Sequence, residues 1–205
     1  MHFVGHDIDV WNSIPKAHKW ALDKLMLADR LGYVCGPSGI SVPKRDTYII
    51  RPCVNLHGMG KGAFKAEIGK TTDLIVPPGY FWSEVFEGDH YSVDYYGGQQ
   101  VLCVLGEKGL EDFTQFSKWC KIKKDIPFPK ELSDLGIGEG WINVEFIGDK
   151  IVEIHFRNNP DFCGHGSDYI IPVWQGQSVK IGKNQKYVEA KDGKRLGYVV
   201  ENESR

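Results

Sequence analysis

Residues 141–160 read WINVEFIGDKIVEIHFRNNP. Apolar and polar residues alternate on both sides of Gly148-Asp149-Lys150, as in two β-strands joined by a tight turn. Because successive side chains of a strand point to opposite faces, each strand has one apolar face and one polar face. The apolar positions are Ile142, Val144, Phe146, Val152, Ile154 and Phe156, and the polar positions are Asn143, Glu145, Glu153, His155 and Arg157.

The length of the turn decides which polar residues meet. A two-residue loop sets Glu145 opposite Val152, whereas a three-residue loop sets it opposite Glu153 and matches the faces along the whole hairpin. The pattern favours the three-residue loop, and so predicts two adjacent carboxylates. Adjacent like charges are unfavourable, and a divalent cation is the simplest way to stabilise them. The alternation is equally typical of a solvent-exposed hairpin, and spacing alone does not separate the two interpretations.

Composition limits the classes of protein to consider. The 205 residues are enough for one domain or two small lobes, and 41% hydrophobic and 25% charged residues are ordinary for a globular protein. A net charge of −2 gives no electrostatic case for a nucleic acid or membrane partner. The N-terminus lacks the pattern of a signal peptide. Five widely spaced cysteines without a C-x-x-C pair indicate a reducing compartment, and we expect a cytoplasmic protein.

The N-terminal third carries three candidate motifs. We expect a helix over residues 15–31 that contains Asp23-Lys24, and a short strand over 48–52 that ends at Arg51-Pro52. A glycine-rich loop follows between two strands, and such a loop can place backbone N–H groups around phosphate oxygens. It matches neither the Walker pattern nor the dinucleotide pattern, and a plain turn is the alternative interpretation. Its residues include Gly58, Gly60, Lys61, Gly62 and Lys65.

The remainder predicts mainly antiparallel strands. A strand over 73–78 ends in Pro77-Pro78, which we take as the boundary between an N-terminal lobe (1–76) and a C-terminal lobe (77–180), followed by a C-terminal hairpin and tail (181–205). Strands with glycine turns cover 81–106, and short helices are expected over 111–121 and 129–135. An apolar strand over 169–174 and a hairpin over 187–200 complete the chain.

Taken in order, these motifs resemble those of the ATP-grasp superfamily of carboxylate–amine and carboxylate–thiol ligases. The resemblance covers about residues 15–165. It rests on Asp23-Lys24, Ile49-Ile50-Arg51-Pro52, Gly58 to Gly62, the hinge pattern E-x-x-x-G at Glu84 to Gly88, and Glu145 with the strand Glu153 to Arg157. It implies an α+β fold in which two lobes with antiparallel sheets grip ATP between them.

The resemblance also implies roles for individual residues. ATP would be bound by Lys24, Arg51, Gly58, Gly60, Lys61, Gly62, Glu84, Val85, Phe86 and His90. Mg²⁺ would be held by Glu145 and Glu153, with His155 and Asn158 as further ligands, and Arg157 and Lys24 would be catalytic. Three positions depart from the family pattern. Arg51 replaces a lysine and keeps its charge. His90 lies near the usual ribose-binding glutamate, which Asp89 or Asp94 could replace, and His155 replaces an asparagine ligand, whose place Asn158 or Asn159 could take.

The reaction implied by the resemblance is ATP-dependent ligation. A carboxylate would be activated as an acyl phosphate and joined to an amine, with release of ADP and phosphate. The alternatives are a kinase-like phosphotransferase on the same fold and a nucleotide-binding module without turnover. The acceptor would be a small molecule, a peptide or a protein. Family members usually carry a preceding α/β domain, whereas the first helix expected here begins near residue 15. We therefore expect a partner subunit, a homodimer or a macromolecular acceptor.

Overall fold

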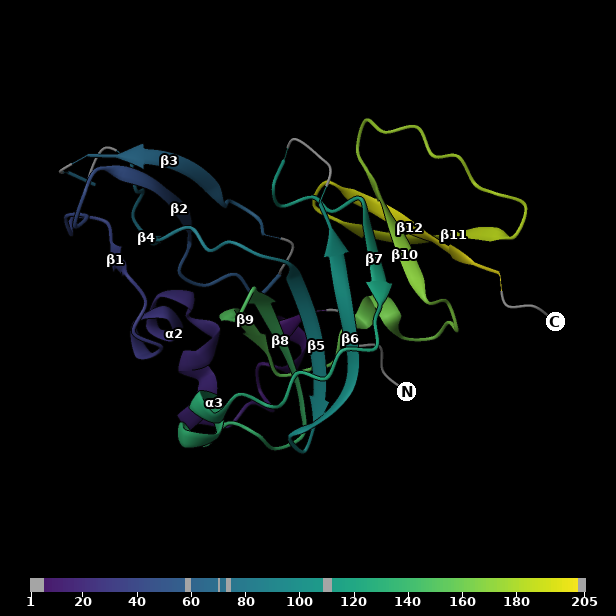
Figure 1. The fold of residues 1–205 in the computed structure, drawn as a ribbon, viewed down its shortest axis with the longest axis horizontal. Helices are drawn as coiled ribbons and strands as arrows, with labels where there is room; N and C mark the ends of the chain where they lie inside the picture. Colours follow the sequence, from purple (N-terminus) through teal and green to yellow (C-terminus); the bar gives the residue numbers. More distant parts are fainter. Residues whose placement is uncertain (1–5, 58–59, 70, 73–74, 109–111, 203–205) are drawn as a thin grey trace.

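Two antiparallel sheets and a few short helices form the structure, a computed structural model that describes residues 6–57, 60–69, 71–72, 75–108 and 112–202 (Figure 1). This arrangement confirms the expected α+β fold. The helices are α1 (Asp7–Val10), η1 (Lys16–Leu22), α2 (Lys24–Arg30), α3 (Lys130–Asp134) and η2 (Pro160–Phe162).

The smaller sheet has four strands in the order β1-β4-β2-β3. Its hairpin β2–β3 carries the glycine-rich loop, which therefore lies between two strands as expected. The sheet packs around Ile50, Ile68 and Trp82, each at most 2% exposed. Its strands are β1 (Cys35–Pro37), β2 (Asp46–Pro52), β3 (Phe64–Ile68) and β4 (Tyr80–Ser83).

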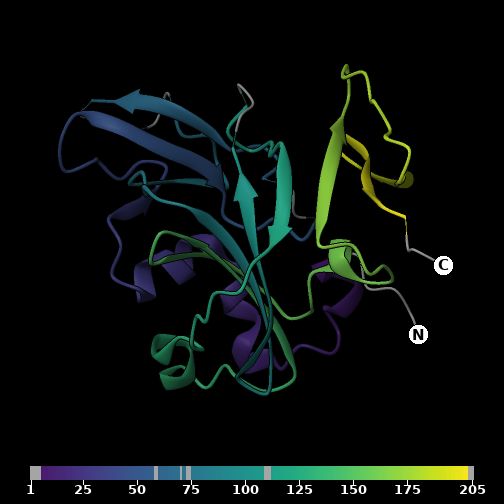
Figure 2. The same ribbon diagram turned by 45° about the vertical axis from the view of Figure 1, so that its right-hand side comes forward.

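The larger sheet has eight strands in the order β11-β12-β10-β7-β6-β5-β8-β9. Figure 2 shows β10 to β12 on the side of the molecule opposite the smaller sheet, with β5 to β7 between them. The strands are β5 (His90–Tyr96), β6 (Gln99–Glu107), β7 (Lys118–Lys121), β8 (Trp141–Ile147), β9 (Lys150–His155), β10 (Tyr169–Trp174), β11 (Gln185–Asp192) and β12 (Arg195–Glu201).

The hairpin β8–β9 sets Glu145 opposite Glu153, as the alternation predicts, but the loop length differs from the expected one. The loop has two residues, because Ile147 pairs with Lys150, and the expected three-residue loop is wrong. A β-bulge between Phe146 and Glu145 then shifts the register by one residue. The bulge restores the match between the two polar faces that the turn alone would have lost.

The alternating strands separate the core from the cavity described below. Their apolar residues, including Val93 and Val144, pack against Leu27 of α2 and Leu132 of α3 on one face of the sheet. Their polar residues therefore lie on the opposite face. Tyr95 is fully buried in the same core, and its hydroxyl donates to the Ile126 carbonyl at 2.9 Å.

Three local expectations are corrected. The helix over 15–31 is interrupted at Asp23, where η1 ends and α2 begins. Residues 118–121 form strand β7 instead of the end of a helix. Phe113, Phe116 and Trp119 do recur at helical spacing. The strand forms nevertheless, because β7 pairs with both β6 and β10. Residues 75–79 form turns instead of a strand, and Asp73 and Leu74 lie outside the described residues.

The linker between the sheets follows β4. Residues 84–89 connect β4 in the smaller sheet to β5 in the larger one, where the hinge pattern was expected. Gly88 (φ +120°) packs so closely on the hairpin turn that a Cβ would lie 2.8 Å from Gly148 Cα. The domain boundary at residue 77 stays a prediction. The two sheets divide at a different place, since β4 belongs to the smaller sheet and β11 and β12 belong to the larger sheet.

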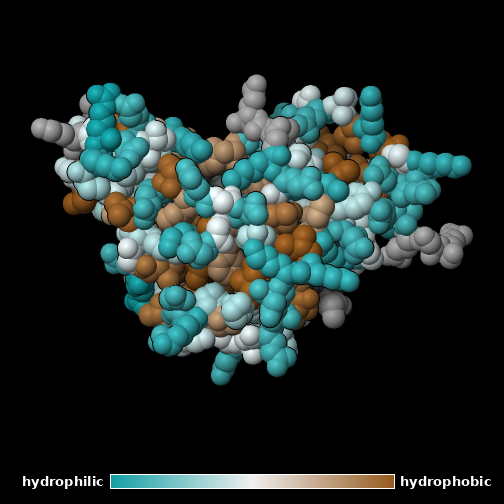
Figure 3. Space-filling model, in the orientation of Figure 1, coloured by the Kyte–Doolittle hydropathy of each residue, from teal (hydrophilic) through white to brown (hydrophobic). Residues whose placement is uncertain are grey.

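The surface is mixed. On the face seen in Figure 3, hydrophobic residues lie in small patches among hydrophilic ones. Among the described residues, no helix is long and apolar enough to cross a membrane.

Candidate active site

A cavity of about 430 Å³ lies between the two sheets. The smaller sheet contributes Arg51 and Ser83, the linker contributes Glu84 to Phe86, and the larger sheet contributes its polar face. The cavity brings together most of the predicted site residues: Lys24, Arg51, Gly60, Lys61, Glu84, Val85, Phe86, His90, Glu145, Glu153, His155 and Arg157.

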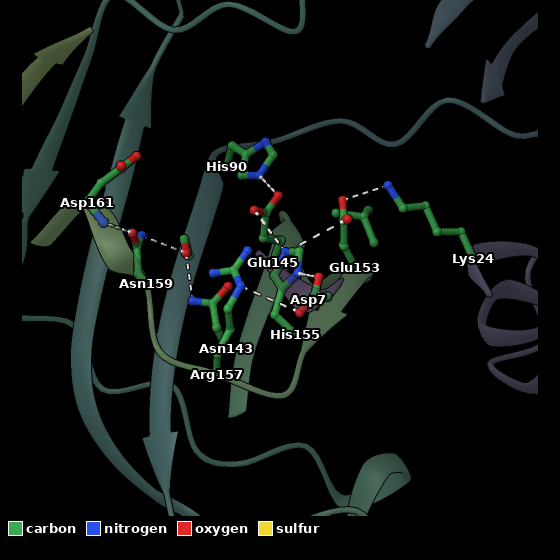
Figure 4. A network of polar contacts seen from close by, with 12 residues as sticks. Asp7, Lys24, His90, Asn143, Glu145, Glu153, His155, Arg157, Asn159 and Asp161 are labelled. Carbon is green, nitrogen blue, oxygen red and sulfur yellow. Dashed lines mark hydrogen bonds and ion pairs between the residues drawn. The ribbon is translucent and has the colours of Figure 1, made fainter. Parts of the chain in front are cut away.

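The two carboxylates of the hairpin are at the centre of a network of basic side chains (Figure 4). Lys24 Nζ lies 2.9 Å from Glu153 Oε2, and His90 Nε2 lies 3.0 Å from Glu145 Oε2. His155 Nε2 lies between the carboxylates, 3.6 Å from Glu145 Oε1 and 3.8 Å from Glu153 Oε1. The repulsion between the carboxylates is thus balanced by protein cations at the same place.

A third carboxylate, Asp7 from α1, joins the network from the far end of the chain. Its Oδ2 lies 2.6 Å from His155 Nδ1, and its Oδ1 lies 3.5 Å from Arg157 Nε. Asp7 is only 1% exposed. Because a buried carboxylate needs a charged partner, α1 is held against β9 by these contacts.

The protonation states follow from this network. Burial opposes ionisation of Glu145, but the nearby His155 and the hydrogen-bonded His90 outweigh it, and the pKa of Glu145 lies well below the usual range. Burial likewise opposes ionisation of Asp7, but His155, Arg157 and Lys24 lower its pKa. Burial and Arg157 disfavour the imidazolium, but Asp7 and Glu145 favour it, and the pKa of His155 rises to about 9. At neutral pH His155 is a cation between carboxylates.

Lys24 reaches the carboxylates because Asp23 starts a new helix. Asp23 is extended, and its Oδ1 accepts hydrogen bonds from the backbone N–H groups of Leu25 (3.0 Å) and Met26 (3.1 Å). Such an N-cap satisfies the free donors of the first turn. The Lys24 N–H donates to the Cys53 carbonyl at 2.7 Å, which ties the start of α2 to the end of β2.

Arg51 links the smaller sheet to the hairpin. Its Nη1 donates to the Val152 carbonyl at 3.1 Å, at the bulge in β9. Its guanidinium also lies 5.0 Å from the centre of the Phe81 ring. Arg51 therefore enters the cavity as a cation from the lobe opposite the carboxylates.

The linker and the glycine-rich loop enclose the cavity. Glu84 is fixed to Val34 by two hydrogen bonds of 3.0 Å, one through its backbone N–H and one through its side chain. Lys61 forms an ion pair with Asp192, at the turn between β11 and β12. Within the described residues, Gly62 does not line the cavity, and Gly58 lies outside the described residues.

A row of buried polar groups continues from the carboxylates. The Asn143 amide donates to Ser92 Oγ and to Asp94 Oδ1, both at 2.8 Å, and the Asn159 backbone N–H donates to Asp94 Oδ1 at 2.8 Å. Burial raises the pKa of Asp94 to about 6, although these donors oppose the shift. The predicted ligand Asn158 is not brought to this row, because its side-chain amide donates to Cys163 Sγ at 2.9 Å.

The donor set suits Mg²⁺ only in part. Glu145 and Glu153 provide two carboxylates, and Mg²⁺ typically takes one or two carboxylates together with phosphate oxygens and water. His155 departs from this donor set, because Mg²⁺ prefers oxygen ligands and the Nε2 atom of His155 lies between the two carboxylates. In the described part of the chain, no group of three or more His, Cys, Asp or Glu side chains is arranged to hold a metal ion.

Several residues of the site were not identified from the sequence. Asp7 lies far in the sequence from every motif, and it is recognised as a site residue only from its ion pair with His155 in the structure. Ser92 lies at an alternate strand position that carries no recognisable pattern. Asp94 was named only as a possible ribose contact and Asn159 only as a possible metal ligand, and their shared hydrogen bond was not foreseen. For Asn143, the signal was present in the polar face of the hairpin.

The comparisons with known proteins agree with this architecture. No model of a known protein family and no curated protein matches the sequence. Solved structures do match: the chain has the ATP-grasp fold.

Three of these structures indicate the extent of the likeness. An ATP-grasp superfamily protein from Archaeoglobus fulgidus superposes with a TM-score of 0.53 at 14% identity, over 92% of this chain and 66% of that one. An N5-carboxyaminoimidazole synthetase from Staphylococcus aureus, complexed with ADP, gives 0.55 at 14% identity, over 92% and 69%. An L-amino acid ligase from Bacillus licheniformis gives 0.51 at 12% identity, over 70% of this chain and 42% of that one.

Proposed function

We propose that the chain is an ATP-dependent ligase that activates a carboxylate as an acyl phosphate and joins it to an amine. The observation that carries this proposal is the position of Glu145 and Glu153, side by side in a cavity between two sheets, with Lys24 and Arg157 in the same cavity. Two of the structures with the same fold are described as a synthetase complexed with ADP and an amino acid ligase, which supports the reaction class.

The proposed chemistry has two steps. A carboxylate oxygen of the acid attacks the γ-phosphorus of ATP, and ADP leaves. The amine nitrogen then attacks the acyl carbon, phosphate leaves, and the amine loses a proton. Both steps require the stabilisation of negative charge more than covalent participation by the protein.

The residues of the cavity suit these demands. Lys24, Arg51 and Lys61 would contact the phosphates, and Glu84 to Phe86 would contact the base at the linker. Arg157 would hold the transferred phosphoryl group, because guanidinium groups bind phosphate in a bidentate manner. Glu145 and Glu153 would hold Mg²⁺, which supplies positive charge to the phosphates when bound.

ADP release separates this proposal from its two alternatives. Purified protein is incubated with ATP, magnesium and pools of acids and amines. ADP formation that requires both an acid and an amine supports the ligase, whereas ADP formation with a phosphorylated product and no need of an amine indicates a phosphotransferase. ATP binding without ADP release from any pool indicates a binding module.

A pair of variants on the same hairpin tests the site itself. We expect Glu145→Gln to reduce ADP release by orders of magnitude, because it removes one charge from the carboxylate pair. Asp149→Asn is the matched control, since this side chain in the turn is 85% exposed. Unchanged ADP release in Glu145→Gln, in a protein that folds normally, would refute the proposed site. The expectation of a partner subunit, a homodimer or a macromolecular acceptor stays a prediction.

A further inference from the structure

One face of the larger sheet lines the cavity, and its character changes from strand to strand: one part of this face is polar and the other part is apolar. The polar side is formed by β5, β8 and β9, which carry the carboxylate network. Across the sheet, His90 on β5 pairs with Gly106 on β6, Gly106 pairs with Trp119 on β7, and Trp119 pairs with Ile170 on β10. Paired residues share a face, so Trp119 and Ile170 extend the face of His90 toward the C-terminal strands.

Gly106 marks the change from polar to apolar. A Cβ at this position would lie 2.7 Å from the Phe116 ring and 2.9 Å from the Trp119 ring. The missing side chain thus makes room for two aromatic rings above β6. Both rings contact the His90 ring, with centroids 4.9 Å and 5.4 Å apart. Because His90 is bonded to Glu145, the aromatic wall begins directly beside the carboxylate network.

Strand β10 continues this wall with Pro172 and Trp174, which also line the cavity. Trp174 is fixed in place, because its Nε1 donates to the Phe116 carbonyl at 3.0 Å. Arg195 on β12 pairs with Trp174 across the sheet and forms an ion pair with Asp161 of η2. Trp174 is therefore a fixed part of the apolar wall.

Arg157 also lines the cavity and is 9% exposed. Its Nε lies 3.5 Å from Asp7 Oδ1 without forming a hydrogen bond to any described residue, and its Nη1 donates to the Asn158 carbonyl at 3.2 Å. Because a guanidinium has five N–H donors, a carboxylate from a ligand can add a charge-assisted contact on the cavity side.

We propose that the acid substrate carries an aromatic or large apolar group that binds against Trp119, Phe116 and Trp174, with its carboxylate directed to Arg157. This inference rests on the proposed function and names the substrate class for it. Arg157, which follows β9, lines the same cavity of about 430 Å³ as Trp119 and Trp174, and this volume is typical of sites that hold small-molecule ligands. Burial of such a ring should improve the affinity about 10- to 100-fold over the same acid without it.

The test compares 3-phenylpropanoate with propanoate by titration calorimetry on the full chain. The two probes share a carboxylate and differ by the ring. We expect 3-phenylpropanoate to bind at least 10-fold more tightly, and we expect Trp119→Leu to remove most of this preference. Trp141→Leu is the matched control, because Trp141 is 40% exposed and lies outside the cavity lining in the described part of the chain.

Equal affinity of the parent chain for the two acids overturns the inference, and this comparison remains valid even when the variant fails to fold. A loss of ATP affinity in Trp119→Leu, without any change in acid binding, also overturns it, because the apolar wall would then be a base-binding site. Ring-dependent acid binding without ADP release in the presence of any amine supports the apolar subsite and refutes the ligase reaction.

Discussion

The replacement of Glu153 by Gln tests how the protein tolerates two adjacent carboxylates. Considered alone, the pair predicts a small gain in stability, about 0.2–1 kcal/mol, when one of two facing like charges is removed. The structure reverses this sign. Lys24 Nζ lies 2.9 Å from Glu153 Oε2, and the two side chains are 6% and 14% exposed, so the substitution leaves a buried ammonium without its counter-charge.

The size of the effect follows from these two contributions. Removal of one partner of a buried ion pair costs about 3–5 kcal/mol, and relief of the repulsion offsets up to about 1 kcal/mol. The partial exposure of Glu153 favours the lower end of the range. We expect Glu153→Gln to lower the free energy of unfolding by about 2–3 kcal/mol. At about 2–4 °C per kcal/mol for a chain of this size, Tm should fall by about 4–12 °C.

Urea denaturation at pH 7 of the parent, Glu153→Gln, Lys24→Met and the double variant measures the coupling directly. The double variant should lose less stability than the sum of the single variants, because each single change leaves the other charge unpaired. Additive losses, or a Glu153→Gln protein at least as stable as the parent, would refute the reasoning. Asp149→Asn serves as a control on the same hairpin, and we expect a change within about 0.5 kcal/mol.

Two further predictions concern the buried network and the linker. The pKa of His155 is raised from 6.5 to about 9, so the protonated imidazole stabilises the folded state. We expect it to contribute about 3 kcal/mol to the free energy of unfolding below pH 6.5, and this contribution should be lost as the pH rises through about 9 in denaturation experiments. Asp7→Asn should flatten this pH dependence and lower the pKa of His155 measured by NMR; an unchanged pKa contradicts the assignment. Gly88→Ala should cost more than about 2 kcal/mol, because φ is +120° and the Cβ would lie 2.8 Å from Gly148 Cα. Gly79→Ala (φ +80°) meets open space and should cost about 1–2 kcal/mol; equal losses in the two variants argue against the close packing of the linker.

The residue pattern by itself determined the elements whose cause is local. Alternation over 141–157 predicted the hairpin, its polar face and the pairing of Glu145 with Glu153, because side chains alternate between the faces of a regular strand. It did not predict the β-bulge that produces this pairing after a two-residue loop. The order of the motifs was enough to predict the α+β fold. The linker at Glu84 to Gly88 was also located from its pattern, and it joins the two sheets.

Only the tertiary structure decided the contacts that depend on distant segments. The pairing of Lys24 with Glu153 and of Asp7 with His155 joins residues more than a hundred positions apart, and no local period records such contacts. The same reason accounts for the error over 111–121. The spacing of the aromatic residues there fits a helix, but hydrogen bonds to β6 and β10 make residues 118–121 a strand and turn Trp119 toward the cavity. Long-range strand pairing outweighs local propensity, since what stabilises a strand is packing against its neighbours in the sheet.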